Sequence, residues 1–136
     1  MSEIKTQVKG AIGENIIIGE FLKRNYDVYL PVVDRGTDCI VRSQTGNYYE
    51  VQIKTRATIG RGMHVFEVRG FKARDNFFIV CYQAALDPES FWIIPSIVFE
   101  KYGLARPTYN SYRLVLTPRK QKMLSKYRNN FSQLEQ

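Results

Sequence analysis

The sequence contains few of the residues that form metal clusters or covalent cross-links. Its 136 residues include two cysteines, Cys39 and Cys81, and one histidine, His64. These three side chains cannot complete a four-ligand structural zinc site unaided. Both cysteines lie inside apolar runs, which is typical of buried thiols in a reducing compartment. We therefore interpret them as buried thiols of a cytoplasmic protein.

Long apolar stretches are also missing. No run approaches the ~18 residues that a membrane span needs. The N-terminus, Met-Ser-Glu-Ile-Lys, has no apolar signal region. A chain of this length buries enough surface for a core without cross-links, and it fits one domain over residues 1–136. We expect a single domain with no membrane partner.

Acidic residues are scarce relative to basic ones, and the net charge is +7. The excess is concentrated in two stretches. The first contains Lys54, Arg56, Arg61, Arg69, Lys72 and Arg74, with Glu67 as its one acid. The second, without any acid, contains Arg119, Lys120, Lys122, Lys126 and Arg128. This distribution favours an acidic partner, of which nucleic acid is the commonest.

The first segment has the periodicity of an amphipathic helix. Apolar residues recur at helical spacing over residues 2–25, and Ser2 is a candidate cap. Gly10 and Gly13 lie within this helix, where each costs about 1 kcal/mol relative to alanine. We expect that the helix approaches another element closely at these glycines.

The rest of the sequence alternates between strand and turn patterns. Strands are predicted over residues 27–31, 38–42, 48–56, 64–69, 76–82, 91–95 and 112–116. Helices are predicted over residues 96–102 and, with a basic surface, 118–134. This order indicates an α/β or α+β domain with a mixed central β-sheet flanked by helices.

The strand over residues 48–56 carries the polar residues that most need an explanation. Its two faces are Tyr49, Val51 and Ile53, predicted to meet the core, and the polar set Glu50, Gln52 and Lys54. Asp38 lies across a hairpin from the polar set and is expected to open its strand at a sheet edge. A half-exposed sheet with a cross-strand ion pair would explain this pattern without any function.

Three short motifs follow one another along the first predicted helix, the loop before the strand over residues 38–42, and the strand over residues 48–56. They are Lys9-Gly10-x-x-Gly13-Glu14, Pro31-x-x-Asp34-x-Gly36-Thr37-Asp38 and Glu50-Val51-Gln52-Ile53-Lys54-Thr55. Together they resemble the PD-(D/E)XK nuclease superfamily. The likeness is closest to small Holliday-junction-resolvase-like and Mrr-like members, in which the second acidic position can be glutamine. It covers residues 9–56 well and 76–100 loosely, and it implies a restriction-endonuclease-like core.

The resemblance also implies roles for individual residues. Asp38 would be the metal-binding aspartate, and Gln52 would give its side-chain oxygen at the position usually held by Asp or Glu. The backbone carbonyl of Ile53 would be a further ligand, and Glu14 would reach the metal directly or through water. Lys54 would orient the attacking water. The implied cofactor is Mg²⁺, or Mn²⁺, because such ions accept a few oxygen ligands and keep several waters.

The expected function is therefore metal-dependent endonuclease cleavage of DNA, by a homodimer or higher homo-oligomer. Gln52 removes one negative charge from the metal site unless Glu50, ~7 Å along the strand, compensates. Two alternatives stay open: a catalytically degenerate nucleic-acid-binding module on the same fold, and an accessory interaction protein with an acidic partner. The candidate phosphate contacts, for which a solvated basic edge is the alternative, are Arg35, Arg56, Arg61, Arg69 and Lys72.

Overall fold

The computed structural model describes residues 5–56, 62–84 and 90–135. The helices are α1 (Thr6–Lys23), α2 (Ser96–Tyr102) and α3 (Pro118–Met123). The strands are β1 (Asp27–Tyr29), β2 (Cys39–Arg42), β3 (Tyr48–Arg56), β4 (His64–Arg69), β5 (Phe77–Gln83), β6 (Ser90–Pro95), β7 (Leu104–Arg106) and β8 (Ser111–Leu116). Three short 3-10 helices are η1 (Pro107–Tyr109), η2 (Ser125–Tyr127) and η3 (Phe131–Glu135).

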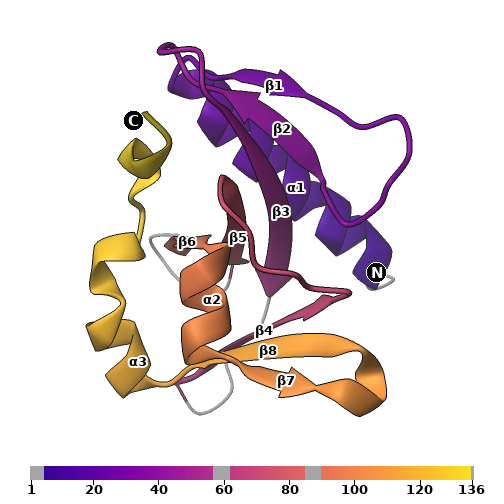
Figure 1. The fold of residues 1–136 in the computed structure, drawn as a ribbon, viewed down its shortest axis with the longest axis vertical. Coiled ribbons are helices and arrows are strands. Elements are labelled where there is room, and N and C mark those ends of the chain that lie inside the picture. Colours follow the sequence, from indigo (N-terminus) through magenta and orange to yellow (C-terminus); the bar gives the residue numbers. More distant parts are fainter. Residues whose placement is uncertain (1–4, 57–61, 85–89, 136) are drawn as a thin grey trace, which may run out of the picture.

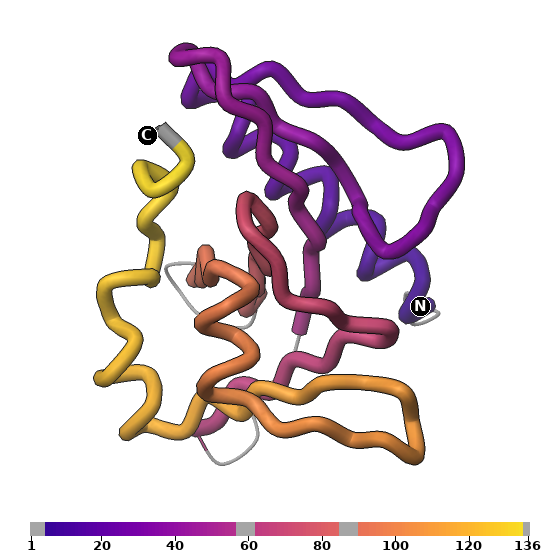
Figure 2. Tube along the Cα trace, in the orientation of Figure 1, coloured from indigo at the N-terminus to yellow at the C-terminus, as the bar shows by residue number. Residues whose placement is uncertain are grey.

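The central layer is a five-stranded sheet in the order β1-β2-β3-β5-β6. β3 pairs parallel with β5, and the other neighbouring pairs are antiparallel. The predicted mixed central sheet is therefore confirmed. β5 lies between β3 and β6 and is buried along its whole length, which explains why its sequence is a continuous apolar run. Figure 1 shows α1 behind β2 and β3, with α2 in front of the sheet, and Figure 2 shows the same arrangement as a tube.

The sheet separates two hydrophobic cores. Alternate residues of β5 enter each core: Phe78, Val80 and Tyr82 on the α1 side, and Phe77, Ile79 and Cys81 on the other. The second core is closed by Phe99 of α2 and by a three-stranded sheet in the order β4-β8-β7. The sequence predicted β4 and β8 as strands, but it indicated neither β7 nor this separate sheet.

Helix α1 confirms one of the two glycine predictions. Gly13 faces β3 so closely that an added Cβ would lie 2.0 Å from Thr55 Oγ1, whereas at Gly10 it would meet nothing within 4 Å. The helix ends at Lys23, earlier than predicted, because Asn25 takes a left-handed conformation with φ of 63°. The predicted cap Ser2 lies outside the described residues.

The prediction of one continuous C-terminal helix over residues 118–134 is wrong. α3 stops at Met123, and Asn129 has a left-handed φ of 54°. Asn129 instead pairs with β6: its backbone N donates to Phe91 O (2.6 Å), and its side-chain Oδ1 accepts from Phe91 N (2.9 Å). This pairing turns the chain so that Phe131 and Leu134 enter the α1-side core.

The two cysteines are free and buried, as expected. Burial raises the pKa of the Cys39 thiol to about 12, so it stays protonated at neutral pH. No helix in the described part of the chain combines the length and the apolar character needed to cross a membrane.

The contact at Gly13 generates a stability prediction with an internal control. We expect Gly13→Ala to lower the free energy of unfolding by about 1–3 kcal/mol, because the new methyl group overlaps Thr55. Gly19 lies in the same helix and meets nothing within 4 Å, so Gly19→Ala should raise stability by about 0.5–1 kcal/mol. Urea denaturation measures both, and a stabilising effect of Gly13→Ala would contradict the close contact.

Candidate active site

Strand β3 separates its polar and apolar side chains as the sequence predicts. Val51 and Ile53 are buried in the α1-side core. Gln52 and Lys54 therefore point to the opposite side of the sheet, where Gln52 is only 9% exposed and Lys54 is half-buried. Gln52 is buried because the β4-β8-β7 sheet and α2 close that side, which could not be read from the strand pattern alone.

Asp38 lies beside the middle of β3. Its backbone N donates to Val51 O (2.9 Å), and its side-chain Oδ2 accepts from Ile53 N (2.6 Å). The β2–β3 register pairs Cys39 with Val51, so the next position places Asp38 opposite Gln52 on the same face. The prediction of a sheet-edge position needs correction: Asp38 just precedes β2, and β2 lies between β1 and β3.

Glu14 of α1 belongs to the same electrostatic environment. Burial raises the pKa of Glu14, and the negative charges of Asp38 and Asp34 raise it further, while Lys54 lowers it. Burial likewise raises the pKa of Asp38, although the hydrogen bond from Ile53 N opposes this shift. A nearby cation stabilises the ionised form of a carboxylate whose pKa is raised in this way.

The oxygen atoms that the sequence predicts as ligands are of the kind that a hard divalent cation prefers. They are two carboxylates, from Asp38 and Glu14, the amide oxygen of Gln52 and the backbone carbonyl of Ile53. Magnesium binds oxygen ligands and often needs only one or two carboxylates. Within residues 5–56, 62–84 and 90–135, no group of three or more His, Cys, Asp or Glu side chains is arranged to hold a metal. A metal here would therefore depend on the amide, the carbonyl and water.

Glu50 does not supply the missing charge. Its carboxylate accepts hydrogen bonds from Arg74 Nε (2.8 Å) and Arg74 Nη2 (2.9 Å), and a third from Thr37 Oγ1 (3.2 Å). The bond with Arg74 is the main reason that the pKa of Glu50 is lowered. Sequence reasoning did not connect Glu50 with Arg74, because the two residues are 24 positions apart and lie on different elements.

Two hollows open on either side of this cluster. One, of about 410 Å³, is lined by Lys9, Glu14, Ile53, Lys54 and Arg56. The other, of about 330 Å³, is lined by Gln52 together with Arg35, Arg69, Lys72 and Arg74. Of the predicted site residues, Glu14, Ile53 and Lys54 line the first hollow and Gln52 lines the second, whereas Asp38 lines neither. Four of the five predicted phosphate contacts line one hollow or the other. The fifth, Arg61, lies outside the described residues.

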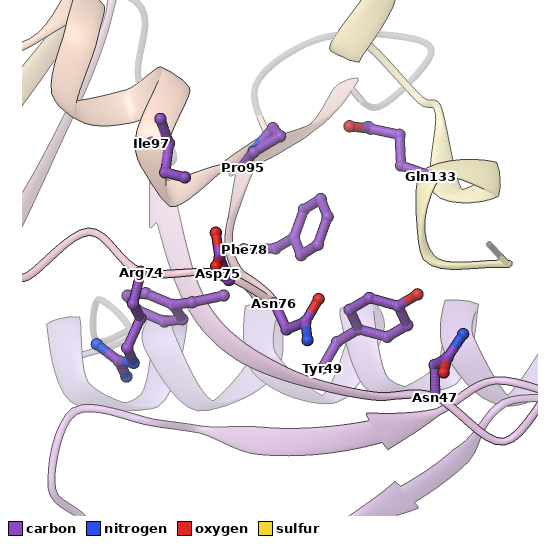
Figure 3. A pocket seen from close by; sticks show the side chains of 10 residues that line it. Asn47, Tyr49, Arg74, Asp75, Asn76, Phe78, Pro95, Ile97 and Gln133 are labelled. Carbon is purple, nitrogen blue, oxygen red and sulfur yellow. The ribbon is translucent and has the colours of Figure 1, made fainter.

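A third hollow contains none of the predicted catalytic residues. It is lined by polar side chains around Tyr49 and Phe78, among them Asn47, Asn76 and Gln133 (Figure 3). Asn47 and Asn76 lie just before β3 and β5 and Gln133 lies in η3, whereas Lys54 lies near the end of β3. This hollow shares Arg74 and Phe77 with the hollow beside Gln52 but contains none of the predicted metal ligands.

Comparison with known proteins identifies the family. The model of the PD-(D/E)XK endonuclease family matches residues 4–122, so the chain belongs to this family. Among solved structures, it is similar to a bacterial homing endonuclease, I-Ssp6803I, with a TM-score of 0.71, 24% identity, and coverage of 97% of this chain and 94% of that chain. This likeness confirms the restriction-endonuclease-like fold. No curated protein matches the sequence, and the resolvase-like and Mrr-like branch stays a prediction.

The Glu50–Arg74 pair generates a prediction about metal binding. Because Arg74 holds the Glu50 carboxylate, Glu50→Gln should leave Mn²⁺ affinity unchanged and lower the free energy of unfolding by about 1 kcal/mol, as for a well-formed exposed ion pair. Asp38→Asn should weaken Mn²⁺ binding. Isothermal titration calorimetry and urea denaturation test this. Equal losses of Mn²⁺ affinity in both variants would place Glu50 in the metal site.

Proposed function

We propose that this protein is a divalent-metal-dependent endonuclease that hydrolyses DNA phosphodiester bonds. The observation that carries the proposal is the convergence of Asp38, Gln52 and Lys54 on one face of the sheet, within the electrostatic reach of Glu14. A structural cross-strand ion pair would need no second carboxylate from a helix. Membership of an endonuclease family supports the same function.

The ligands in this proposal are the Asp38 and Glu14 carboxylates, Gln52 Oε1 and the Ile53 carbonyl. The hydrogen bond from Ile53 N fixes the Asp38 carboxylate through Oδ2 and would leave Oδ1 free for an ion. A Mg²⁺ or Mn²⁺ ion held by these residues would supply Lewis acidity to the phosphate and would activate water as a nucleophile. Lys54 orients the attacking water and stabilises the negative charge that grows on the phosphate.

The charge around the site is suited to a DNA backbone. Arg35, Arg56, Arg69 and Lys72 line the two hollows, and none of them forms an ion pair with another described residue. Cations of this kind attract phosphates and make DNA binding weaken as salt rises. This supports DNA as the substrate.

Gln52 supports a second candidate function. An amide carries no charge, so this metal site has one negative charge fewer than a site with Asp or Glu at the same position. A chain that holds DNA but binds metal too weakly to cut it would be a nucleic-acid-binding module. The third candidate, an accessory protein with an acidic protein partner, rests on net charge alone.

Cleavage of supercoiled plasmid DNA in Mg²⁺ or Mn²⁺ tests the proposal. We expect the wild-type protein to cut, and Asp38→Asn and Lys54→Ala each to lower the cleavage rate by about 100-fold or more, as for the loss of a group that stabilises transition-state charge. Lys23→Ala is the matched control, because it removes one exposed lysine near the end of α1.

The outcomes separate the three functions. Unchanged cleavage in Asp38→Asn and Lys54→Ala would show that the site is elsewhere. Salt-sensitive DNA binding without cleavage in either metal would favour the binding module. No binding to supercoiled, branched or single-stranded nucleic acid at low salt would favour the accessory protein.

We also propose that the protein acts as a homodimer, because one site per chain cuts one strand at a time. Helix α1 exposes Val8 (49%), Ile12 (46%) and Leu22 (55%) on a single side. Such an apolar stripe fits the same helix of a second copy.

Sedimentation velocity tests the dimer. We expect the mass of two chains for the wild-type protein and of one chain for Ile12→Glu, because the new charge would be buried in the interface. Leu104→Glu, at a more exposed apolar residue of β7, should remain dimeric. A monomeric wild-type protein, or a dimeric Ile12→Glu variant, would contradict the proposed interface.

A further inference from the structure

The hollow beside Gln52 gathers positive charge from segments that are far apart in the sequence. Arg35 comes from the turn before Asp38, Arg69 ends β4, and Lys72 and Arg74 lie in the connection to β5. We call this hollow the basic pocket. No carboxylate is among the described residues that line it.

The cations of the basic pocket fall into two kinds. Arg74 is neutralised by Glu50 and also lies over the Phe77 ring, 3.9 Å from its centroid, so it has a structural role. Arg35, Arg69 and Lys72 form no ion pair with any described residue. Their uncompensated charges converge on one hollow, which is a suitable environment for an anion.

Gln52 supplies an independent observation. The residue is about nine-tenths buried, its side chain lines the basic pocket, and no side-chain hydrogen bond joins it to another described residue. Its amide atoms are not among the fully buried side-chain atoms that lack a partner, so they reach the pocket, where a ligand can bond to them. An amide offers an acceptor oxygen and a donor NH₂ group, whereas a carboxylate offers only acceptors.

We propose that the basic pocket binds a backbone phosphate of DNA next to the one that is cut, and that Gln52 Nε2 donates a hydrogen bond to it while Gln52 Oε1 faces the metal site. This inference rests on the proposed function for the choice of DNA as ligand. Gln52 and Lys54 are ~7 Å apart along β3, so the phosphate at Gln52 is a neighbour of the one at Lys54.

The proposal gives a physical reason for glutamine at this position. A carboxylate at position 52 would add charge to the metal site, but it would also repel the phosphate and pair with Arg35, Arg69 or Lys72. The uncharged amide binds the metal less tightly than a carboxylate would, but it leaves the three cations unpaired and able to bind DNA. Gln52→Glu should therefore change metal affinity and DNA affinity in opposite directions.

The test measures DNA binding in EDTA, by fluorescence anisotropy with a short fluorescein-labelled duplex. We expect Gln52→Glu to weaken binding by about tenfold or more, the size of one lost charge-assisted hydrogen bond. Mn²⁺ binding without DNA, measured by calorimetry, should become tighter in the same variant. If Gln52 had only a structural role, DNA affinity and Mn²⁺ affinity would not change in opposite directions.

Two cation variants locate the pocket. Arg69→Gln and Lys72→Gln should each weaken DNA binding in the absence of metal. Each should also reduce the slope of log Kd against log salt concentration by about one, as expected for the loss of one phosphate contact. Lys23→Gln is the charge-matched control and should do neither. Gln52→Met removes the hydrogen-bond donor without burying a charge, so its affinity for the duplex should also fall by about tenfold. If Gln52→Glu does not fold, Gln52→Met alone tests the role of the donor.

The assignment is overturned if Gln52→Met binds the duplex as tightly as the wild-type protein, or if Arg69→Gln and Lys72→Gln behave like Lys23→Gln. Sodium phosphate should displace the duplex no better than sodium chloride of equal ionic strength, and stronger displacement would assign the pocket to free phosphate instead. Absence of cleavage with these binding effects intact would reject the proposed catalysis and support the pocket, so the two failures are distinguishable.

Discussion

The hydrogen bond from Ile53 N to Asp38 Oδ2 ties the candidate site to the fold. It is short, at 2.6 Å, and together with the bond from Asp38 N to Val51 O it extends the β2–β3 pairing by one residue through a side chain. The position of Asp38 relative to Gln52 and Lys54 is thereby set by the sheet register rather than by the preceding loop. A site built on strands in this way is held more rigidly than one built on loops.

The same register explains what the sequence could predict. Alternation along residues 48–56 correctly placed Val51 and Ile53 in the core and Gln52 and Lys54 on the other face, because a strand has only two faces. The two glycines of α1 predicted close approaches, of which the one at Gly13 occurs and the one at Gly10 does not. Helix propensity shows that a glycine is costly without showing what it faces. Local patterns determine such features, so one sequence suffices.

Features that depend on distant contacts could not be predicted. The burial of Gln52 depends on the β4-β8-β7 sheet, in which the paired residues of β4 and β8 lie 42 to 52 positions apart in the chain. Residues 118–134 have a helical pattern, yet the pairing of Asn129 with Phe91 interrupts it. Tertiary contacts of this kind override local propensity. The Glu50–Arg74 pair belongs to the same class, and it changes Glu50 from a possible ligand into a structural residue.

The structure also divides the basic residues into those that serve the fold and those that remain free of ion pairs. In the C-terminal basic cluster, Lys120 Nζ donates to Tyr102 O (2.9 Å) and Arg128 Nε donates to Ser90 Oγ (2.8 Å), so these cations serve the fold. Arg106 and Arg113 are paired with Glu67. Around the candidate site, by contrast, the cations that line the hollows form no ion pair with a described residue, apart from Arg74. Net charge alone suggested an acidic partner without showing where it binds. The unpaired cations lie around Gln52 and Lys54, so a phosphate is attracted most strongly to this part of the surface. The attraction is strongest there because these charges are not already neutralised by carboxylates of the protein.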